Sequence, residues 1–549
     1  MPLQKNQVLT LRVERLSSDG SGVAHSPDGE TVFIPGAAPG DEARVRIVKD
    51  CKRYAFGILD EVLTPSPDRI PVDCAVAGPC GGCSLRHLDY AAELRAKQEN
   101  VADAFARIGG LDVPVLPIVG SPEVNRYRNK VQFPVGVDKS GKPCIGFYAG
   151  RTHRIVPCPD CRLQPGVLNE IGNALCAFFA EKGIQPYSEE TGRGLVRHIF
   201  LRRGAHSGQI MVCLVCTRAK LPSAEELCTR LKAQFAEITT ILLNVNAKNT
   251  NVILGTETHT LYGQGYIEDT LCGVPVQLGP LSFYQVNTLA AEQLYGIAAQ
   301  YAQLTPDDLL LDLYCGMGTI GLSMAAHCRE LIGVEIVPEA IESAKANAAR
   351  MGADVAAKSR FFCADAGQAA TRLAAEGLHP DIVMLDPPRK GCDEATLSAV
   401  VRMSPRRVVY VSCNPATAAR DAAWLEQNGY HAEKVQPVDL FSRTKHVECV
   451  IALSKGEIDS KKVRVEFSLE GMDTSGLQKG ATYPEIKARV LEQTGLRVSS
   501  LYISQVKQKC GLEVRENHHK AKSENTKQPQ CPKEKEDAIV EALKHFQMI

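Results

Sequence analysis

The chain has 549 residues, of which 44% are hydrophobic and 23% are charged, and its 63 Lys and Arg residues balance 63 Asp and Glu residues. This length and composition exclude wholesale disorder and predict several domains, since a single core rarely grows beyond ~250–300 residues. The balanced charge by itself gives no support to nucleic-acid binding, which would depend on the local distribution of charge. The N-terminus lacks the apolar segment of a signal peptide, and no run approaches the ~18 apolar residues of a spanning helix. We therefore expect a cytoplasmic protein with no membrane partner.

Residues 1–63 predict a small closed β-barrel of the OB-like type. Strand-like segments separated by glycine-rich turns run through this region, at residues 7–16, 31–36, 43–50 and 54–63. About five short strands in so short a stretch are typical of OB-like barrels, many of which bind oligonucleotides. The fold alone does not establish that function. Prolines then mark a linker, at Pro65, Pro67 and Pro71.

Residues 70–275 predict a strand-rich central domain. A helical pattern at 88–110 comes first, and we expect the stretch 88–120 to pack on the domain that follows. The segment from Arg126 to Arg154 contains seven Lys or Arg residues and one acid. Aromatic residues lie among them, namely Tyr127, Phe133, Phe147 and Tyr148. This mixture suits phosphate contact with base stacking, and a solvated sheet face is the alternative.

A glycine-rich loop carries three of the chain's twenty cysteines, Cys74, Cys80 and Cys83. A disulfide framework is a poor interpretation, because cysteines of a cytosolic chain stay reduced. No histidine is nearby, so we expect ligation by cysteines alone, of either an iron–sulfur cluster or zinc. The segment VPCPDC is expected to supply the fourth ligand, either Cys158 or Cys161.

From residue 276 to residue 455 the pattern changes to alternating apolar strands and helices. This rhythm predicts a doubly wound, Rossmann-like α/β domain with a mostly parallel sheet, in which ligands bind at the carboxyl ends of the strands. The expected strands lie at 309–315, 330–337, 360–366, 381–388, 406–413 and 448–453.

Glycines and acids at these strand ends indicate a cofactor site. Gly316 and Gly318 follow the first strand, and Glu335, Asp365 and Asp386 end the next three. An acid at the second strand end can accept both ribose hydroxyl groups. Three acids do not suit a phosphate-bearing cofactor but fit a neutral nucleoside joined to a sulfonium and an amino acid. The alternative for each acid is that it caps the following helix.

Cys413 ends a strand just before a helix start at Asn414 and Pro415, which predicts a reactive thiol. A helix N-terminus favours the thiolate. A thiolate that adds to carbon 6 of a uracil activates carbon 5, and a base must then remove the carbon 5 proton. We assign Glu448 as that base. Arg389 follows two prolines, where amino-methylating enzymes have an aromatic residue, and it is a candidate to hold phosphate or the substrate carbonyl together with Lys390.

Several motifs together are specific, namely FYQVN, LDLYCGMGTIGL, GVEIVPEAI, LDPPRKG, VSCNP and HVE. With the N-terminal barrel and the cysteine loop, they resemble the RumA/RlmD-type 23S rRNA (uracil-5-)-methyltransferases over nearly all of residues 1–455. The resemblance implies a TRAM barrel, a class I methyltransferase domain and S-adenosylmethionine as methyl donor. It also implies a 4Fe–4S cluster, which we expect to have a structural or RNA-fitting role.

The resemblance further implies a role for individual residues. The implied cluster ligands are Cys74, Cys80, Cys83 and Cys161. The implied S-adenosylmethionine contacts are Gln285, Tyr314, Glu335, Asp365 and Asp386. Cys413 is the implied nucleophile and Glu448 the implied general base. The implied substrate is 23S ribosomal RNA, bound by a monomer with the target uridine flipped into a pocket between the barrel and the catalytic domain. The alternatives are a tRNA uracil-5-methyltransferase and a catalytically silent RNA-binding ribosome-assembly factor.

Residues 456–549 look like a small α/β appendage. The stretch 461–471 is strand-like, and helices are expected at 483–496, 499–512 and 533–547. Two short helices with a tight turn would suit a helix-turn-helix-like module, and a plain docking extension is the alternative. The appendage resembles extensions on Firmicute-type members of the family.

Overall fold

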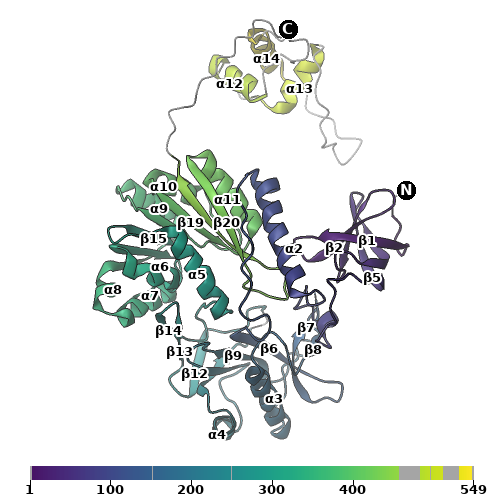
Figure 1. The fold of residues 1–549 in the computed structure, drawn as a ribbon, viewed down its shortest axis with the longest axis vertical. Coiled ribbons are helices and arrows are strands. Elements are labelled where there is room, and N and C mark those ends of the chain that lie inside the picture. Colours follow the sequence, from purple (N-terminus) through teal and green to yellow (C-terminus); the bar gives the residue numbers. More distant parts are fainter. Residues whose placement is uncertain are drawn as a thin grey trace. The chain divides into compact units, whose positions relative to one another are not determined.

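The computed structural model describes residues 3–150, 152–248, 250–456, 483–494, 496, 498–510 and 531–546. The chain forms two compact units, Met1–Asp459 and Ser460–Ile549. The first unit contains a closed barrel and two seven-stranded sheets (Figure 1). Among the described residues, no helix combines the length and the apolar character needed to cross a membrane.

The N-terminal barrel closes in the order β1-β2-β3-β5-β4. Its strands are β1 (Val8–Leu16), β2 (Ser21–His25), β3 (Thr31–Pro35), β4 (Glu42–Asp50) and β5 (Tyr54–Thr64). Alternate side chains point inward and form a core that includes Val13, Val32 and Val45. A Cβ on Gly57 would lie 2.3 Å from Cγ1 of Val45, so only glycine fits that wall. The predicted OB-like barrel is confirmed.

The central sheet follows the order β12-β11-β10-β9-β6-β7-β8. Its strands are β6 (Lys130–Val137), β7 (Pro143–Tyr148), β8 (Ile155–Pro157), β9 (Val196–Arg203), β10 (Ile210–Cys216), β11 (Ile238–Val245) and β12 (Glu257–Tyr262). Helices α3 (Gly166–Glu181) and α4 (Ala224–Gln234) supply apolar residues to the core on one of its faces. A small hairpin of β13 (Ile267–Leu271) and β14 (Val274–Leu278) leads into the next domain.

The aromatic residues of the basic segment mostly belong to the interior. Phe133 is fully buried, and its ring centroid lies 5.5 Å from that of Phe147, which packs against the same core. Tyr127 is also buried and donates a hydrogen bond to the carbonyl oxygen of Ser442 at 3.0 Å. The prediction that these three rings stack on RNA bases is therefore wrong. Phe133 of β6 and Phe147 of β7 pack into the core that α3 and α4 cover, while Tyr127 precedes β6 and is held by its hydrogen bond to Ser442.

The catalytic sheet follows the order β17-β16-β15-β18-β19-β21-β20. Its strands are β15 (Leu309–Leu313), β16 (Glu330–Glu335), β17 (Ser359–Cys363), β18 (Ile382–Leu385), β19 (Arg407–Ser412), β20 (Tyr430–Val438) and β21 (Glu448–Lys455). Strands β15 to β19 are mutually parallel, and β21 runs antiparallel to both β19 and β20. The predicted doubly wound α/β domain is confirmed.

Helices cover both faces of this sheet. One face packs on α5 (Thr288–Ala302), α6 (Thr319–Met324) and α7 (Pro338–Met351). The other packs on α9 (Ala366–Ala375), α10 (Glu394–Met403) and α11 (Pro415–Gln427). The long helix α2 (Tyr90–Asp103) continues as the π-helical turn η1 (Ala104–Gly109), and both join the second of these cores beside α11. In Figure 1, α2 runs between the barrel and the catalytic sheet.

Three further short helices complete the first unit, α1 (Ala77–Cys80), η2 (Ala325–His327) and α8 (Ala353–Lys358). The second unit contains α12 (Tyr483–Thr494), α13 (Ser500–Lys509) and α14 (Lys533–His545), close to where the sequence predicts helices. They share a core that includes Ile486, Ile503 and Ile539. The predicted strand at 461–471 lies outside the described residues.

Candidate functional site

Cys413 and Glu448 lie next to each other at one edge of the catalytic sheet. Strand β19 ends at Ser412 and β21 begins at Glu448, and the antiparallel register pairs Ser412 with Cys449. The next step of that register sets Cys413 beside Glu448. The predicted nucleophile and the predicted base are therefore brought together at the carboxyl ends of the parallel strands, where ligands of such sheets bind.

Burial determines the protonation of this pair. It raises the pKa of Glu448 to about 8, with a further increase from Asp386, while Arg389 opposes the shift. Burial also raises the pKa of the Cys413 thiol, and the neighbouring Glu448 adds to this effect. The sequence-based expectation of a lowered thiol pKa is thus wrong, because burial and the neighbouring acid outweigh the favourable groups.

Arg389 is a cation that acts on the Cys413 thiol. Its side chain hydrogen-bonds the Cys413 sulfur and so lowers the pKa of that thiol. Its Nη2 lies 3.5 Å from Nδ1 of His446. Burial, followed by Arg389 and Lys445, lowers the pKa of His446 to about 4, so the ring is neutral and able to accept. Asn414 fixes the backbone of Arg389 by donating to its carbonyl oxygen at 3.0 Å.

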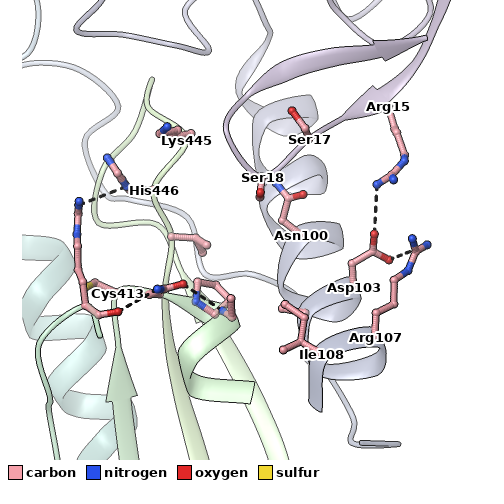
Figure 2. Close-up of a pocket in the computed structure, with 16 residues that line it drawn as sticks. Arg15, Ser17, Ser18, Asn100, Asp103, Arg107, Ile108, Cys413, Lys445 and His446 are labelled. Carbon is pink, nitrogen blue, oxygen red and sulfur yellow. Dashed lines mark hydrogen bonds and ion pairs between the residues drawn. The ribbon is translucent and has the colours of Figure 1, made fainter. Parts of the chain in front are cut away.

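A cavity of about 510 Å³ opens onto Cys413. Figure 2 shows it between the catalytic strand ends on one side and the barrel with α2 and η1 on the other. The lining residues include Arg15, Ser17, Ser18, Asn100, Asp103, Arg107, Arg389, Cys413, Lys445 and His446. The structure thus contains a pocket between barrel and catalytic domain, where the sequence predicted a flipped nucleotide. Lys445 and His446 were not among the predicted site residues. The available signal was the HVE motif, which begins at His446 and directly follows Lys445.

Two of the predicted cofactor residues, Tyr314 and Glu335, lie at the glycine turn after β15. Tyr314, Gly316 and Gly318 all have positive φ, at 66°, 55° and 79°. Such a conformation suits glycine and exposes backbone N–H groups at the strand end. Glu335 holds this turn, because its Oε2 accepts from the N–H of Gly316 at 3.2 Å and its Oε1 accepts from the N–H of Val337 at 2.9 Å.

The other three predicted cofactor residues have distinct surroundings. Burial raises the pKa of Asp386 to about 7. Asp365 accepts from the N–H of Gln368 at 3.1 Å and so caps α9, which is the structural alternative considered for it. The side chain of Gln285 hydrogen-bonds the Tyr295 hydroxyl group. Asp365 and Asp386 follow the strands β17 and β18, whereas Gln285 precedes α5.

Asp312 is a buried acid that the sequence analysis did not single out. Its Oδ2 accepts from the N–H of Gly321 at 3.0 Å, while its Oδ1 has no partner. Burial raises its pKa to about 8, and Asp386 and Glu335 add to the shift. The signal available in the sequence was a lone acid inside the apolar run LLLDL.

The four predicted cluster cysteines come from segments far apart in the chain. Cys74, Cys80, Cys83 and Cys161 are all free and half-buried. Burial raises the pKa of Cys80, and Cys161, Cys83 and Cys74 each raise it further, so the four thiols share one neighbourhood. Among the described residues, however, no group of three His, Cys, Asp or Glu side chains has the geometry of a site for one metal ion.

Cys158 and Cys161 differ in character. The Cys158 thiol hydrogen-bonds Cys161, and this contact is the main cause that lowers the pKa of Cys161 to about 6. Arg86 and Arg128 favour the Cys161 thiolate further. The same contact raises the pKa of Cys158. Of the two alternatives left open by the sequence, Cys161 has the surroundings of an anionic sulfur.

Comparison with known proteins identifies relatives along most of the chain. Residues 200–456 match the family model described as tRNA (Uracil-5-)-methyltransferase, and residues 2–59 match the TRAM domain. An uncharacterized RNA methyltransferase of Halalkalibacterium halodurans is 43% identical over 453 residues, covering 82% of this chain and 98% of that protein. One from Oceanobacillus iheyensis is 41% identical over 455 residues, with the same coverage.

A solved structure has the same architecture over most of its length. It is the Pyrococcus abyssi tRNA (uracil-54, C5)-methyltransferase in complex with S-adenosyl-L-homocysteine, with a TM-score of 0.65 and 26% identity. The alignment covers 81% of this chain and 100% of that one. The N-terminal barrel is therefore a TRAM domain, and the doubly wound sheet is that of a class I methyltransferase. The chain belongs to the family of S-adenosylmethionine-dependent RNA (uracil-5-)-methyltransferases.

Proposed function

We propose that the protein transfers a methyl group from S-adenosylmethionine to carbon 5 of a uridine in 23S ribosomal RNA, through a covalent adduct between Cys413 and carbon 6. The observation that carries this proposal is the register of β19 and β21, which sets Cys413 beside Glu448 at the edge of the pocket. A nucleophile and a base that act in succession on two adjacent ring carbons must lie this close together.

The proposed reaction balances without any further reactant. The Cys413 thiolate adds to carbon 6, and the electron pair of the 5,6 double bond moves toward the carbonyl oxygen at position 4 as an enolate. Carbon 5 then attacks the sulfonium methyl group, and S-adenosylhomocysteine leaves. Glu448 takes the proton from carbon 5, the carbon 6–sulfur bond breaks, and the double bond and the thiolate are restored.

Arg389 and Glu448 have the surroundings that these steps need. The Arg389 guanidinium hydrogen-bonds the sulfur and favours the thiolate, against the effect of burial. Glu448, with a pKa of about 8, is a stronger base than an exposed glutamate, because a raised pKa increases the driving force for taking a proton. His446 stays neutral and adds no competing positive charge beside Arg389.

We assign the cofactor contacts to Gln285, Tyr314, Glu335, Asp365 and Asp386. Glu335 supports this assignment because its carboxylate lies at the glycine turn, where a ribose would meet the strand ends. Asp365 remains in the set, since a carboxylate that caps a helix through one oxygen can still accept a hydrogen bond from adenine through the other.

We further propose that Cys74, Cys80, Cys83 and Cys161 hold a 4Fe–4S cluster. The donor set fits, because it consists of thiols alone, and Arg86 hydrogen-bonds Cys83 and can offset thiolate charge. Bound there, the cluster would tie the loop of Cys74–Cys83 to that of Cys161.

The substrate is tested with the purified protein, labelled S-adenosylmethionine, and either unmodified ribosomal RNA or unmodified tRNA, followed by nucleoside analysis. We expect 5-methyluridine in 23S RNA, and mapping of the modified position would identify the uridine. If only tRNA becomes labelled, the substrate is tRNA, as the name of the Pyrococcus abyssi relative states for that protein, and the proposal of 23S RNA is wrong. A complete lack of transfer, with Cys413 dispensable in cells, would instead support a silent RNA-binding factor.

A further inference from the structure

Three cations meet where the central sheet faces the catalytic domain. The register of β6 and β9 pairs Lys130 with Arg202, so the two side chains share one face of the sheet. Arg128 also lies close enough to Lys130 to lower its pKa electrostatically, as Arg202 does. On this face, the β9 residue Phe200 belongs to the core of the catalytic domain, whereas Val131 belongs to the opposite core. Lys130 therefore points toward the interface between the two sheets.

Arg202 is buried and Arg128 and Lys130 are half-buried, yet none of the three has the acidic partner that a buried charge normally has. Arg202 is 1% exposed, and it donates only to the carbonyl oxygens of Gly279 and Ser282, at 2.8 and 2.7 Å. The Nε atoms of Arg128 and Arg202 are buried and have no acceptor. Burial and the two arginines lower the pKa of Lys130 to about 8. Within the described ranges no carboxylate forms an ion pair with any of the three. Arg128 also acts on the Cys161 thiol, so the shortage of negative charge falls on Lys130 and Arg202.

The cluster lies between the two halves of the proposed active site. Asn129 separates Arg128 from Lys130, and its Nδ2 donates to the carbonyl oxygen of Gln285 at 2.8 Å, on the cofactor side. On the other side, Arg128 is near enough to help lower the pKa of His446 in the target pocket. An anion held here would therefore belong to one of the two reactants. S-adenosylmethionine carries a carboxylate, and the RNA carries phosphates.

We propose that Lys130, assisted by Arg128, binds an oxyanion of a reactant, either the carboxylate of S-adenosylmethionine or a phosphate beside the target uridine. The chemistry is the same for both, since an ammonium group donates to any oxyanion as a compact point charge. The identity of the two reactants rests on the proposed function. The cation cluster itself follows from the contacts above.

The experiment compares Lys130→Gln, which removes the charge, with Lys130→Arg, which keeps it. Affinities are measured for S-adenosylhomocysteine, for 5′-methylthioadenosine, which lacks the amino-acid part, and for a 23S RNA fragment over a range of salt concentrations. If the anion is the carboxylate, Lys130→Gln weakens S-adenosylhomocysteine about 10-fold and leaves methylthioadenosine unchanged. If it is the phosphate, only RNA binding weakens, and the slope of log affinity against log salt falls by ~0.7–0.9. In both cases Lys130→Arg binds nearly as the wild type does.

Unchanged affinities and salt slope in Lys130→Gln would overturn the inference, as would an equal loss in Lys130→Arg. Thermal unfolding followed by the fluorescence of Trp424, the only tryptophan, checks that the variants are folded. If Lys130→Gln does not fold, Arg128→Gln replaces it, with the same expected pattern at a smaller amplitude. Failure of the wild type to methylate RNA would count against the proposed function, while the S-adenosylhomocysteine arm would still decide the role of Lys130.

Discussion

The backbone N–H of Leu85 donates a hydrogen bond to the carbonyl oxygen of Arg443, with 3.1 Å between nitrogen and oxygen. Leu85 lies two residues after Cys83, and Arg443 lies two residues before Lys445 of the target pocket. Arg443 also donates from Nη1 to the carbonyl oxygen of Leu88 at 2.8 Å. Hydrogen bonds therefore join the segment that follows the cysteine loop to the loop that carries Lys445 and His446.

Replacing Cys161 by serine should remove bound iron, whereas Cys158→Ser should retain it. The two residues are neighbours of similar chemistry, so the second variant is a matched control for the loss of a thiol. Iron and sulfide are measured per chain, together with the visible absorbance of the cluster. Cys80→Ser should lose iron as Cys161→Ser does and should also lower folded yield or RNA affinity. Full stability and activity without iron would contradict a structural or RNA-fitting role.

Glu448→Gln should accumulate a covalent complex between protein and RNA. The glutamine cannot accept the carbon 5 proton, so attack and methylation proceed while elimination fails, and turnover falls by ~10²–10⁴-fold. The complex is seen as labelled RNA that stays with the protein on a denaturing gel. The double variant Cys413→Ala with Glu448→Gln should form none, and an adduct that persists in it would exclude Cys413 as the nucleophile.

The rate of product formation should rise with pH through the pKa of Glu448 and should continue to rise as the Cys413 thiol ionises. The base acts in its deprotonated form, and its pKa is raised to about 8, so below that value each pH unit should increase the rate about tenfold. Single-turnover methylation between about pH 6 and pH 9 measures this dependence. A rate that is flat across the range would show that deprotonated Glu448 does not limit the reaction.

Asp312→Asn should flatten the fall in stability as pH rises from about 4 to about 8. The folded pKa of Asp312 is about 8, far above the ordinary 3.8, so between these values the folded state binds more protons than the unfolded state. The contribution of Asp312 to the free energy of unfolding is complete below the ordinary pKa of 3.8 and is lost as pH rises through the folded pKa of about 8. Melting temperatures followed by Trp424 fluorescence should therefore fall less with rising pH in the variant. An identical fall in both proteins would contradict the assignment.

Arg389→Ala should make the Cys413 thiol less reactive at neutral pH. Removing the guanidinium leaves burial and Glu448 unopposed, so the pKa of the thiol rises further and the thiolate fraction falls. Alkylation of the Cys413 peptide, followed by mass spectrometry, should slow several-fold, with partial recovery in Arg389→Lys. Unchanged alkylation together with reduced methylation would mean that Arg389 acts on the RNA and not on the sulfur.

The sequence was sufficient for the layout of the molecule. Glycine-rich turns between short alternating strands predict the barrel, and strand–helix alternation predicts the parallel sheet. Such patterns suffice because they depend on local order along the chain. The rings of Tyr127 and Phe133 were misassigned because their segment is basic, whereas their burial depends on distant parts of the chain. The core under α3 and α4 covers Phe133, and the hydroxyl group of Tyr127 bonds to Ser442.

By itself the sequence determined that Cys413 and the strand-end acids would gather at one edge, because chain order in a parallel sheet puts every carboxyl end on the same side. The antiparallel direction of β21 brings its first residue, Glu448, to that edge, and this direction was a decision of the tertiary structure. Only the tertiary structure decided how these groups ionise. Burial raises the pKa values of Cys413 and Glu448, and Arg389 counters it, since desolvation and charge act through space between residues far apart in the chain. Packing likewise decided that Lys130, Arg128 and Arg202 meet without an acid.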